Sequence, residues 1–156
     1  MDAYSRIITG FDLQPTLSTE GPYNALKQTV DFYQSYGFDL KGLIFHSDRG
    51  CQYVSKQMTD YEASLGIVTS VTQTGNPLHN AMAERLNGII KNDWLYNFED
   101  KPIDEVREIL SQTIALYNTA RPHRALNKKT PMQMLIPDYP NPVSYTHLRA
   151  HETRGN

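Results

Sequence analysis

The stretch HNAMAERLNGIIK, residues 79–91, carries the most informative pattern in the sequence. Its apolar residues recur at spacings of three and four, which predicts an amphipathic helix. Asn80, Glu84 and Lys91 are four and seven residues apart, so they share one face of that helix. A face that carries an amide, a carboxylate and an amine is unusual for a core helix. It suits a helix that borders a metal site and a phosphate backbone.

A second acid lies upstream, at the end of a short apolar strand. Residues 41–47 predict this strand, Asp48 follows it, and Gly50 indicates a turn. Thirty-five residues separate Asp48 from Glu84. His46 precedes Asp48 by two residues and therefore faces the same side of the strand. No set of Cys or His accompanies it, so we interpret His46 as a core or supporting residue and not as a zinc ligand.

Three separated motifs carry a resemblance to a known family. They are HSDRGCQY (46–53), GNPLHNAMAERLNGIIKND (75–93) and LYNTARPHRALNKKTP (116–131). Together they resemble the integrase core of bacterial insertion-sequence transposases, which is related to retroviral integrases and is called DDE after its three carboxylates. The resemblance covers residues 1–137, and the gap between Asp48 and Glu84 also fits the family. It implies an α/β domain with the RNase H-like fold, in which helices flank a mixed sheet.

The resemblance also implies a chemistry, phosphoryl transfer on DNA. Two divalent ions about 3.5–4 Å apart stabilise the attacking and leaving oxygens of such a reaction. Mg²⁺ prefers oxygen ligands, so we expect Asp48 and Glu84 to hold Mg²⁺ or Mn²⁺ as catalytic and metal-binding residues. The alternatives are that Asp48 caps the next helix and that Glu84 is an ordinary solvated acid.

The first carboxylate of the family lies on a strand that precedes the one matched by residues 1–13. That strand is absent from this sequence. Asp2 matches a different family position, and we interpret it as a structural or exposed acid at the start of a strand. We therefore expect an N-terminally truncated core that lacks its central first strand and is inactive by itself in DNA cleavage and strand transfer.

The expected DNA contacts come from two places. In the family pattern Asn80 lines the site and Lys91 touches the DNA end, although Asn80 could equally cap the helix and Lys91 could be a solvated surface residue. The family's C-terminal signature matches Tyr117, Asn118, Thr130 and Pro131, and a basic loop lies between them. The loop residues expected to contact phosphates are Arg121, His123, Arg124, Lys128 and Lys129. The alternative is a structural latch that folds the C-terminal turn back on the core.

Periodicity predicts the remaining elements. A strand, a break and a second strand are expected over residues 1–13, and Ser18 or Thr19 is expected to cap a helix that ends at Gly37. A helix over 55–65 ends at Gly66, a buried strand covers 67–71, and a loop covers 72–78. A helix over 103–117 and one helical turn over 131–135 follow. Residues 138–142 are expected to form a linker.

The last stretch, residues 143–156, has no apolar period. Its sequence SYTHLRAHET resembles the translation of a sequencing-library adapter, so we expect read-through that is not part of the fold.

Composition limits the class of protein. The 156 residues suggest one domain, and 39% hydrophobic residues suffice for one core. One cysteine and the lack of a long apolar run predict a cytoplasmic protein without a membrane span. The net charge of −2 means that DNA contacts must come from local patches.

Three functions remain open at this point. The first is a transposase core that acts on transposon ends and target DNA and forms a homo-oligomer in its full-length form. The second is a non-catalytic remnant or a dimerising inhibitor of a full-length transposase. The third is an RNase H-type nuclease, which the spacing of the motifs disfavours.

Overall fold

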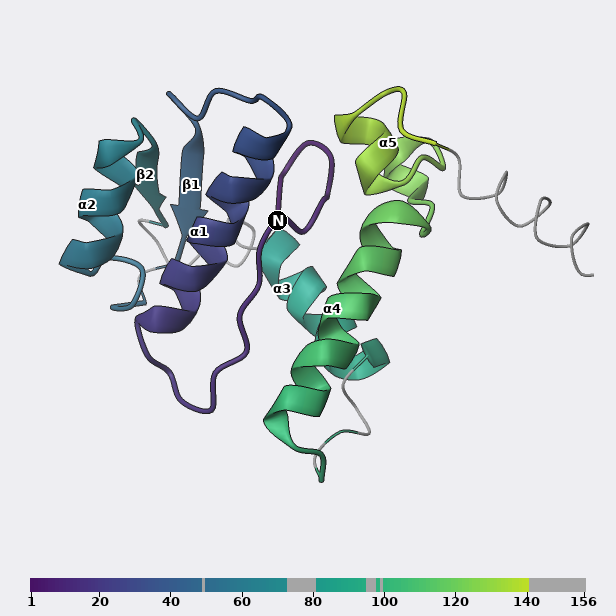
Figure 1. Ribbon diagram of the computed structural model, residues 1–156, viewed down its shortest axis with the longest axis horizontal. Coiled ribbons are helices and arrows are strands. Elements are labelled where there is room, and N and C mark those ends of the chain that lie inside the picture. The colour runs from purple at the N-terminus through teal and green to yellow at the C-terminus, as the bar shows by residue number, and fades with distance from the viewer. Residues whose placement is uncertain (49, 73–80, 95–97, 99, 141–156) are drawn as a thin grey trace, which may run out of the picture. The chain divides into compact units, whose positions relative to one another are not determined.

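Figure 1 shows the computed structural model, which describes residues 1–48, 50–72, 81–94, 98 and 100–140. The chain forms two compact units: one contains Met1 and residues 9–107, and the other contains residues 2–8 and 108 onward. None of the helices in the described ranges is long and apolar enough to cross a membrane. The elements are α1 (Glu20–Ser35), β1 (Ile44–Ser47), α2 (Lys56–Ser64), β2 (Val68–Val71), α3 (Ala81–Ile89), the π-helical turn η2 (Ile90–Trp94), α4 (Ile103–Thr119), the 3₁₀ turn η3 (Arg124–Leu126) and α5 (Pro131–Leu135).

The sheet of the first unit consists of two parallel strands, β1 and β2. The register pairs Ile44 with Val68 and Ser47 with Val71. The amide of Thr72 continues the pairing, since it donates to the carbonyl oxygen of Ser47 at 3.1 Å. Parallel strands need a long crossover, and α2 supplies it here. The two strands were predicted from their short apolar runs, and the structure confirms both.

Helix α1 also forms where the apolar spacing predicts it. Leu26, Val30 and Tyr33 lie on its buried face. Gly37 follows the helix with a φ of 75°, a left-handed conformation that glycine adopts without strain. The expected side-chain cap is wrong, however: Thr19 occupies the N-cap position, but its φ and ψ are already helical and its side chain makes no capping hydrogen bond.

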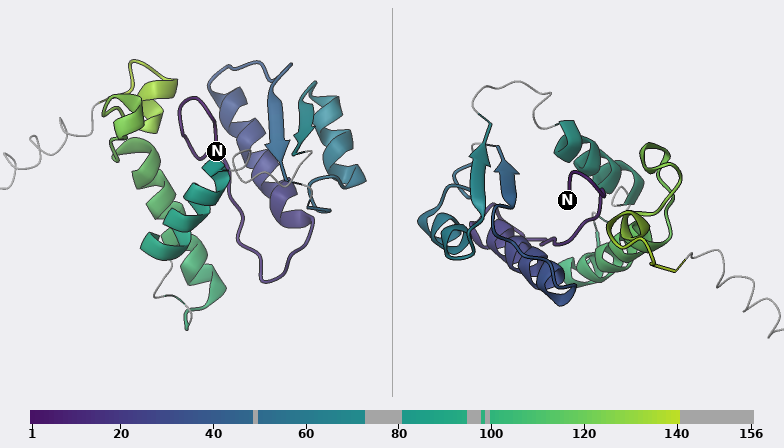
Figure 2. Two further views of the ribbon diagram at one scale, coloured as in Figure 1. Left: turned by 180° about the vertical axis from the view of Figure 1, so that it is seen from behind. Right: turned by 90° about the horizontal axis from the view of Figure 1, so that it is seen from above.

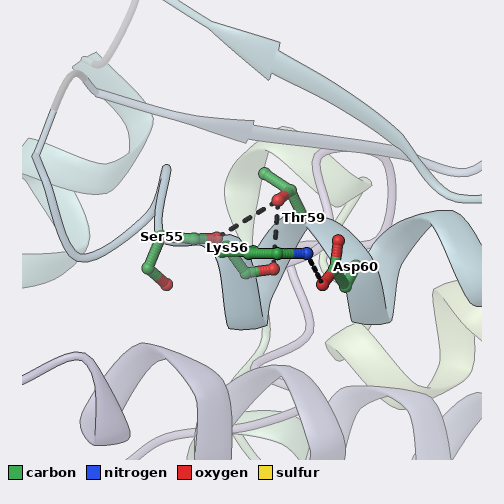
Figure 3. Close-up of polar contacts among 4 residues, drawn as sticks. All are labelled: Ser55, Lys56, Thr59 and Asp60. Carbon is green, nitrogen blue, oxygen red and sulfur yellow. Dashed lines mark hydrogen bonds and ion pairs between the residues drawn. The ribbon is translucent and has the colours of Figure 1, made fainter.

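Helix α2 begins after an N-cap residue with extended backbone, Ser55 (Figure 3). The side chains of Lys56 and Asp60 form an ion pair of 2.7 Å across one turn, and the Thr59 hydroxyl lies 3.3 Å from the carbonyl oxygen of Ser55. Met58 is buried on the opposite side of the helix. Both groups of the ion pair are exposed, so it contributes little to stability.

The two helices α1 and α2 lie on the same side of the sheet (Figure 2). The Thr69 hydroxyl of β2 donates to the buried carboxylate of Glu62 in α2, which marks this covered side. Ile44 and Val68 are paired across the strands on the other side, and their side chains are 66% and 52% exposed. The prediction that β2 is buried is therefore wrong, because α1 and α2 lie on the opposite face of the sheet.

The two strands expected over residues 1–13 do not form. In this segment the polar groups find partners on α1: the amide of Phe11 donates to Gln28 at 3.3 Å, and the hydroxyls of Thr9 and Thr29 are 3.0 Å apart. Gly10 lies so close to α1 that a Cβ there would be 2.1 Å from the carbonyl oxygen of Ala25. A strand requires a neighbouring strand, and β1 pairs only with β2 in the described part of the chain.

The second unit is built on the C-terminal part of α4. The amide side chain of Asn118 accepts a hydrogen bond from the Ile8 amide at 2.9 Å and donates one to the Ile8 carbonyl oxygen at 2.8 Å. This clamp joins positions 110 residues apart in the sequence. The buried apolar side chains of this unit are Ile7, Ile8, Leu110, Ile114, Tyr117, Leu126 and Met132.

Asp2 has a structural role in the second unit, as predicted, although it lies in a turn and not at the start of a strand. Its Oδ1 accepts hydrogen bonds from the amide and the hydroxyl of Ser5, both at 2.6 Å. The amide of Asp2 donates to the carbonyl oxygen of Ile7 at 2.8 Å, which closes the turn.

Candidate metal and nucleic-acid site

Asp48 lies directly after the carboxyl end of β1 and its side chain is exposed. Its Oδ1 accepts a hydrogen bond from the amide of Gly50 at 2.9 Å, so the carboxylate stabilises the turn that follows the strand. Helix α2 does not begin until Lys56, and Ser55 occupies its N-cap position. The alternative that Asp48 caps this helix is therefore wrong.

His46 lies two residues before Asp48, on the exposed side of β1. Its Nδ1 is 3.0 Å from the hydroxyl of Ser70, and its Nε2 is 3.2 Å from the hydroxyl of Thr72. Both ring nitrogens therefore have partners on β2 or just after it. The contacts tie the ends of the two strands together next to Asp48. The exposed ring is not a core residue, and its supporting role at the site stays a prediction.

Tyr53 lines the same pocket as Asp48, although no spacing in the sequence indicates it. Its ring lies 6.4 Å from that of Phe45 on β1, measured between ring centroids. Burial raises the pKa of the Tyr53 phenol, and the negative charge of Asp48 raises this pKa further. The phenol therefore keeps its proton at neutral pH and can donate a hydrogen bond.

Helix α3 carries Glu84, whose side chain is exposed. Lys91 is also exposed, but it lies in the π-helical turn η2, after the α-helix has ended at Ile89. The seven-residue spacing of Glu84 and Lys91 therefore does not fall within one continuous α-helix. Asn80, the third residue predicted for this face, lies outside the described residues, as does the segment 143–156.

A pocket of about 260 Å³ in the first unit brings Asp48 close to α3. Residues of β1, α1 and α3 line it, and His46, Asp48, Tyr53 and Asn87 are among them. Asn87 follows Glu84 by one helical turn, and sequence analysis did not single it out. The three-residue spacing from Glu84 was a usable signal, since positions i and i+3 share a helix face.

The Asp48 carboxylate at this pocket suits a hard divalent cation, because such ions prefer oxygen ligands. Glu84 is not among the residues that line the pocket. Binding of such an ion is favoured because the Asp48 carboxylate is exposed and lines the pocket. No group of three or more His, Cys, Asp or Glu residues in the described ranges is arranged to hold a metal. That Asp48 and Glu84 share a divalent ion therefore stays a prediction.

The C-terminal motif of the second unit divides into buried and exposed residues. Asn118, Thr130 and Pro131 are buried. Thr130 forms a reciprocal capping box with Gln133 at the start of α5, in which each residue's side chain bonds the backbone of the other. These residues hold the fold together, as the latch interpretation of the motif requires.

The basic loop between these residues is closed by its own backbone. The amide of His123 donates to the carbonyl oxygen of Lys129 at 3.0 Å, and the amide of Lys128 donates to that of His123 at 2.9 Å. The half-buried His123 ring packs edge-on against Tyr117, with the centroids 4.7 Å apart. The exposed cations of the loop are Arg121, Arg124, Lys128 and Lys129. The loop therefore presents four positive charges on a fixed backbone.

The fold and the sequence together define the class of this protein. Two profiles of the family described as integrase core domain match the chain, one at residues 1–77 and the other at residues 65–131. The chain belongs to this family, as an integrase core of the DDE type found in insertion-sequence transposases.

Two transposases of insertion sequence elements are similar to this chain in sequence. The chain is 30% identical over 135 residues to a transposase of the insertion sequence element IS986/IS6110 from Mycobacterium tuberculosis, which covers 85% of this chain and 49% of that protein. It is 29% identical over 135 residues to the transposase of the element IS904 from Lactococcus lactis subsp. lactis, which covers 84% of this chain and 51% of that protein. The chain thus spans about half the length of these relatives.

A solved structure supports the fold class. The integrase catalytic core domain of HTLV-2, solved in complex with magnesium, superimposes with a TM-score of 0.59 at 18% identity. The match covers 86% of this chain and 80% of the viral domain. The predicted RNase H-like α/β fold is confirmed.

Proposed function

We propose that this chain is the catalytic-core part of a DNA transposase that cleaves transposon ends and joins them to target DNA. The observation that carries the proposal is the position of Asp48. Its exposed carboxylate lies at the carboxyl end of a strand, in a turn fixed by Gly50, and borders a pocket that α3 also lines. The integrase core family and its transposase relatives support the same reaction class.

In this proposal Asp48 and Glu84 hold Mg²⁺ or Mn²⁺. The bound ions would neutralise charge that develops on the phosphate oxygens during the reaction. Asp48 orients its carboxylate through the bond from Gly50, and His46 fixes the adjacent strand ends. The exposed cations of the basic loop contact DNA phosphates and so position the substrate. Lys91 adds a further positive charge, and we assign Asn80 and His123 to the same DNA-binding set.

We further infer that these 156 residues alone do not cleave or join DNA. The inference rests on the resemblance, in which a further carboxylate precedes the two at Asp48 and Glu84. Asp2 does not match that position, and its Oδ1 accepts hydrogen bonds from Ser5. In the full-length form we expect a homo-oligomer that acts on DNA in the cytoplasm.

A second candidate function is a remnant or a dimerising inhibitor of a full-length transposase. The paired side chains Ile44 and Val68 favour it, since both are largely exposed on the uncovered face of the sheet. An apolar face of this kind can bind a second chain. Strand transfer by a related full-length transposase, measured with and without this chain, tests the inhibitor, because an inhibitor must reduce that activity.

Metal binding by the chain tests the site assignment. We expect weak Mn²⁺ binding in a calorimetric or water-relaxation titration, and we expect Asp48→Asn and Glu84→Gln each to weaken it at least about fivefold. Asp60→Asn is the matched control, because Asp60 is an exposed helix acid paired with Lys56. Unchanged binding in both site variants, or an equal loss in the control, would contradict the assignment.

A further inference from the structure

Helix α2 buries a carboxyl group against the sheet. Its two buried side chains are Met58 and Glu62, whereas the buried residues of α1 are all uncharged. One of the two side chains that anchor α2 is therefore a polar group. We propose that α2 opens locally from the sheet more readily than α1 does, that the turn of residues 50–55 moves with it, and that burial of Glu62 promotes this opening.

The two oxygens of the Glu62 carboxyl group are unequally satisfied. Oε2 accepts a hydrogen bond from the Thr69 hydroxyl, whereas Oε1 is buried and has no hydrogen-bond partner among the described residues. A buried polar atom without a partner destabilises the closed state, because nothing replaces the water that it loses. Thr69 itself is exposed, so water competes for its hydroxyl. Both carboxyl oxygens regain water when α2 opens, and burial of Glu62 therefore favours the open state.

The beginning of α2 lacks the interactions that hold a helix end. Ser55 occupies the N-cap position without a capping bond, and its hydroxyl lies 3.2 Å from the carbonyl oxygen of Gln52, to which it donates. No acidic residue lies in the first turn, and Lys56 places a positive charge where the helix dipole disfavours one. A nine-residue helix depends on packing to persist. We therefore expect the opening to begin at this end.

The turn before α2 connects the opening to the pocket beside Asp48. The amide of Tyr53 donates to the carbonyl oxygen of Gly50 at 2.9 Å, and the amide of Gly50 donates to Asp48 Oδ1 at 2.9 Å. The Tyr53 ring lies against Phe45 and lines the pocket. In the open state Tyr53 leaves the pocket wall, which widens the pocket next to Asp48.

Hydrogen–deuterium exchange of the full chain, followed by NMR, tests this opening. In the wild type we expect the hydrogen-bonded amides of α2, Gly50 and Tyr53 to exchange at least about tenfold faster than those of α1. Their rates should depend little on low concentrations of urea, because local opening exposes little surface. Glu62→Leu removes the unpartnered oxygen at similar size and should slow these amides about tenfold. Glu108→Leu is the matched control, because it replaces an exposed acid of α4 and should leave their rates unchanged.

Thr69→Val tests whether the carboxyl group is responsible. It removes the donor to Oε2, so it should speed exchange of α2 about threefold in the wild type and have no effect in the Glu62→Leu background. Equal protection of α1 and α2 in the wild type, or unchanged α2 rates in Glu62→Leu, would overturn the proposal. Slowing of α2 without slowing at Gly50 and Tyr53 would contradict the coupling to the pocket. These measurements involve neither DNA nor metal, so their outcome is independent of the proposed function.

Discussion

Asparagine serves two different purposes in this chain. Asn118 is buried and uses both ends of its amide to satisfy the backbone of Ile8. Asn87 is exposed and lines the pocket next to Asp48. The residue type alone cannot distinguish the two, because each purpose depends on what the fold places next to the amide.

Replacing Asn118 by Ala should destabilise the chain by about 2–4 kcal/mol, because two buried backbone groups of Ile8 lose their partners. Urea denaturation followed by circular dichroism measures this loss. The exposed Asn92 provides the control, and Asn92→Ala should stay within about 0.5 kcal/mol of wild type. Similar midpoints for the two variants would mean that the clamp contributes nothing to stability.

Tyr53 should give stability a dependence on alkaline pH. Burial raises the pKa of its phenol in the folded chain above the ordinary value of 10.0. The folded state therefore favours the protonated phenol: its contribution is fully present below pH 10 and is lost as the pH rises through the raised pKa. Unfolding free energies measured between pH 8 and pH 11 should fall less steeply in Tyr53→Phe. Superimposable curves would show that the phenol is not desolvated.

The elements differ in how well local sequence determines them. Helices α1 and α4 were predictable because their apolar side chains recur within one segment, as at Val106, Leu110 and Ile114. The conformation of residues 1–13 was not predictable, because a strand forms only beside a neighbouring strand, and the segment itself does not determine whether that neighbour is present. The same holds for the exposure of Val68, which reflects a sheet face left uncovered by α1 and α2.

For the candidate site too, local sequence predicts residues within a motif but not residues that the fold brings together. Asp48 and Glu84 were predicted from motifs, and the structure places both on the exposed surface of the elements expected. Asn87 and Tyr53 were missed because their importance comes from a pocket formed by three elements. The Asn118 clamp joins residues 110 positions apart, so no spacing rule within one element could have predicted its partner.

The basic loop is the element on which DNA binding should depend most. Lys128→Ala with Lys129→Ala should weaken binding to all sequences alike. Removing two phosphate contacts should flatten the slope of log K against log salt by about two units on duplex DNA. Lys56→Ala with Lys101→Ala is the control, because it removes two exposed cations that pair with acids elsewhere. An unchanged slope in the loop variant would favour a purely structural latch.

Two properties of the whole chain bear on DNA binding: its net charge and the fraction of its relatives' length that it spans. The net charge of −2 gives the chain no general affinity for DNA, so binding must rely on the loop and the pocket. The chain spans about half the length of its transposase relatives, which leaves room for further DNA-binding parts in those proteins.

Deleting residues 143–156 tests the prediction that this segment is not part of the fold. The melting temperature of the chain without it should equal that of the full chain within about 1 °C, because no apolar period links the segment to a core. Thermal unfolding followed by circular dichroism is sufficient. A markedly lower melting temperature in the shortened chain would show that the segment packs on the domain.

Metal-dependent strand transfer on transposon-end DNA shows whether Asp48 and Glu84 are catalytic carboxylates. Four proteins are compared: the present chain, a chimera that adds the first strand and carboxylate of a related transposase, and this chimera with Asp48→Asn or Glu84→Gln. We predict Mg²⁺- or Mn²⁺-dependent joining by the unsubstituted chimera alone. Joining by the present chain, or joining that survives both substitutions in the chimera, would contradict the assignment of Asp48 and Glu84 as two of three required carboxylates.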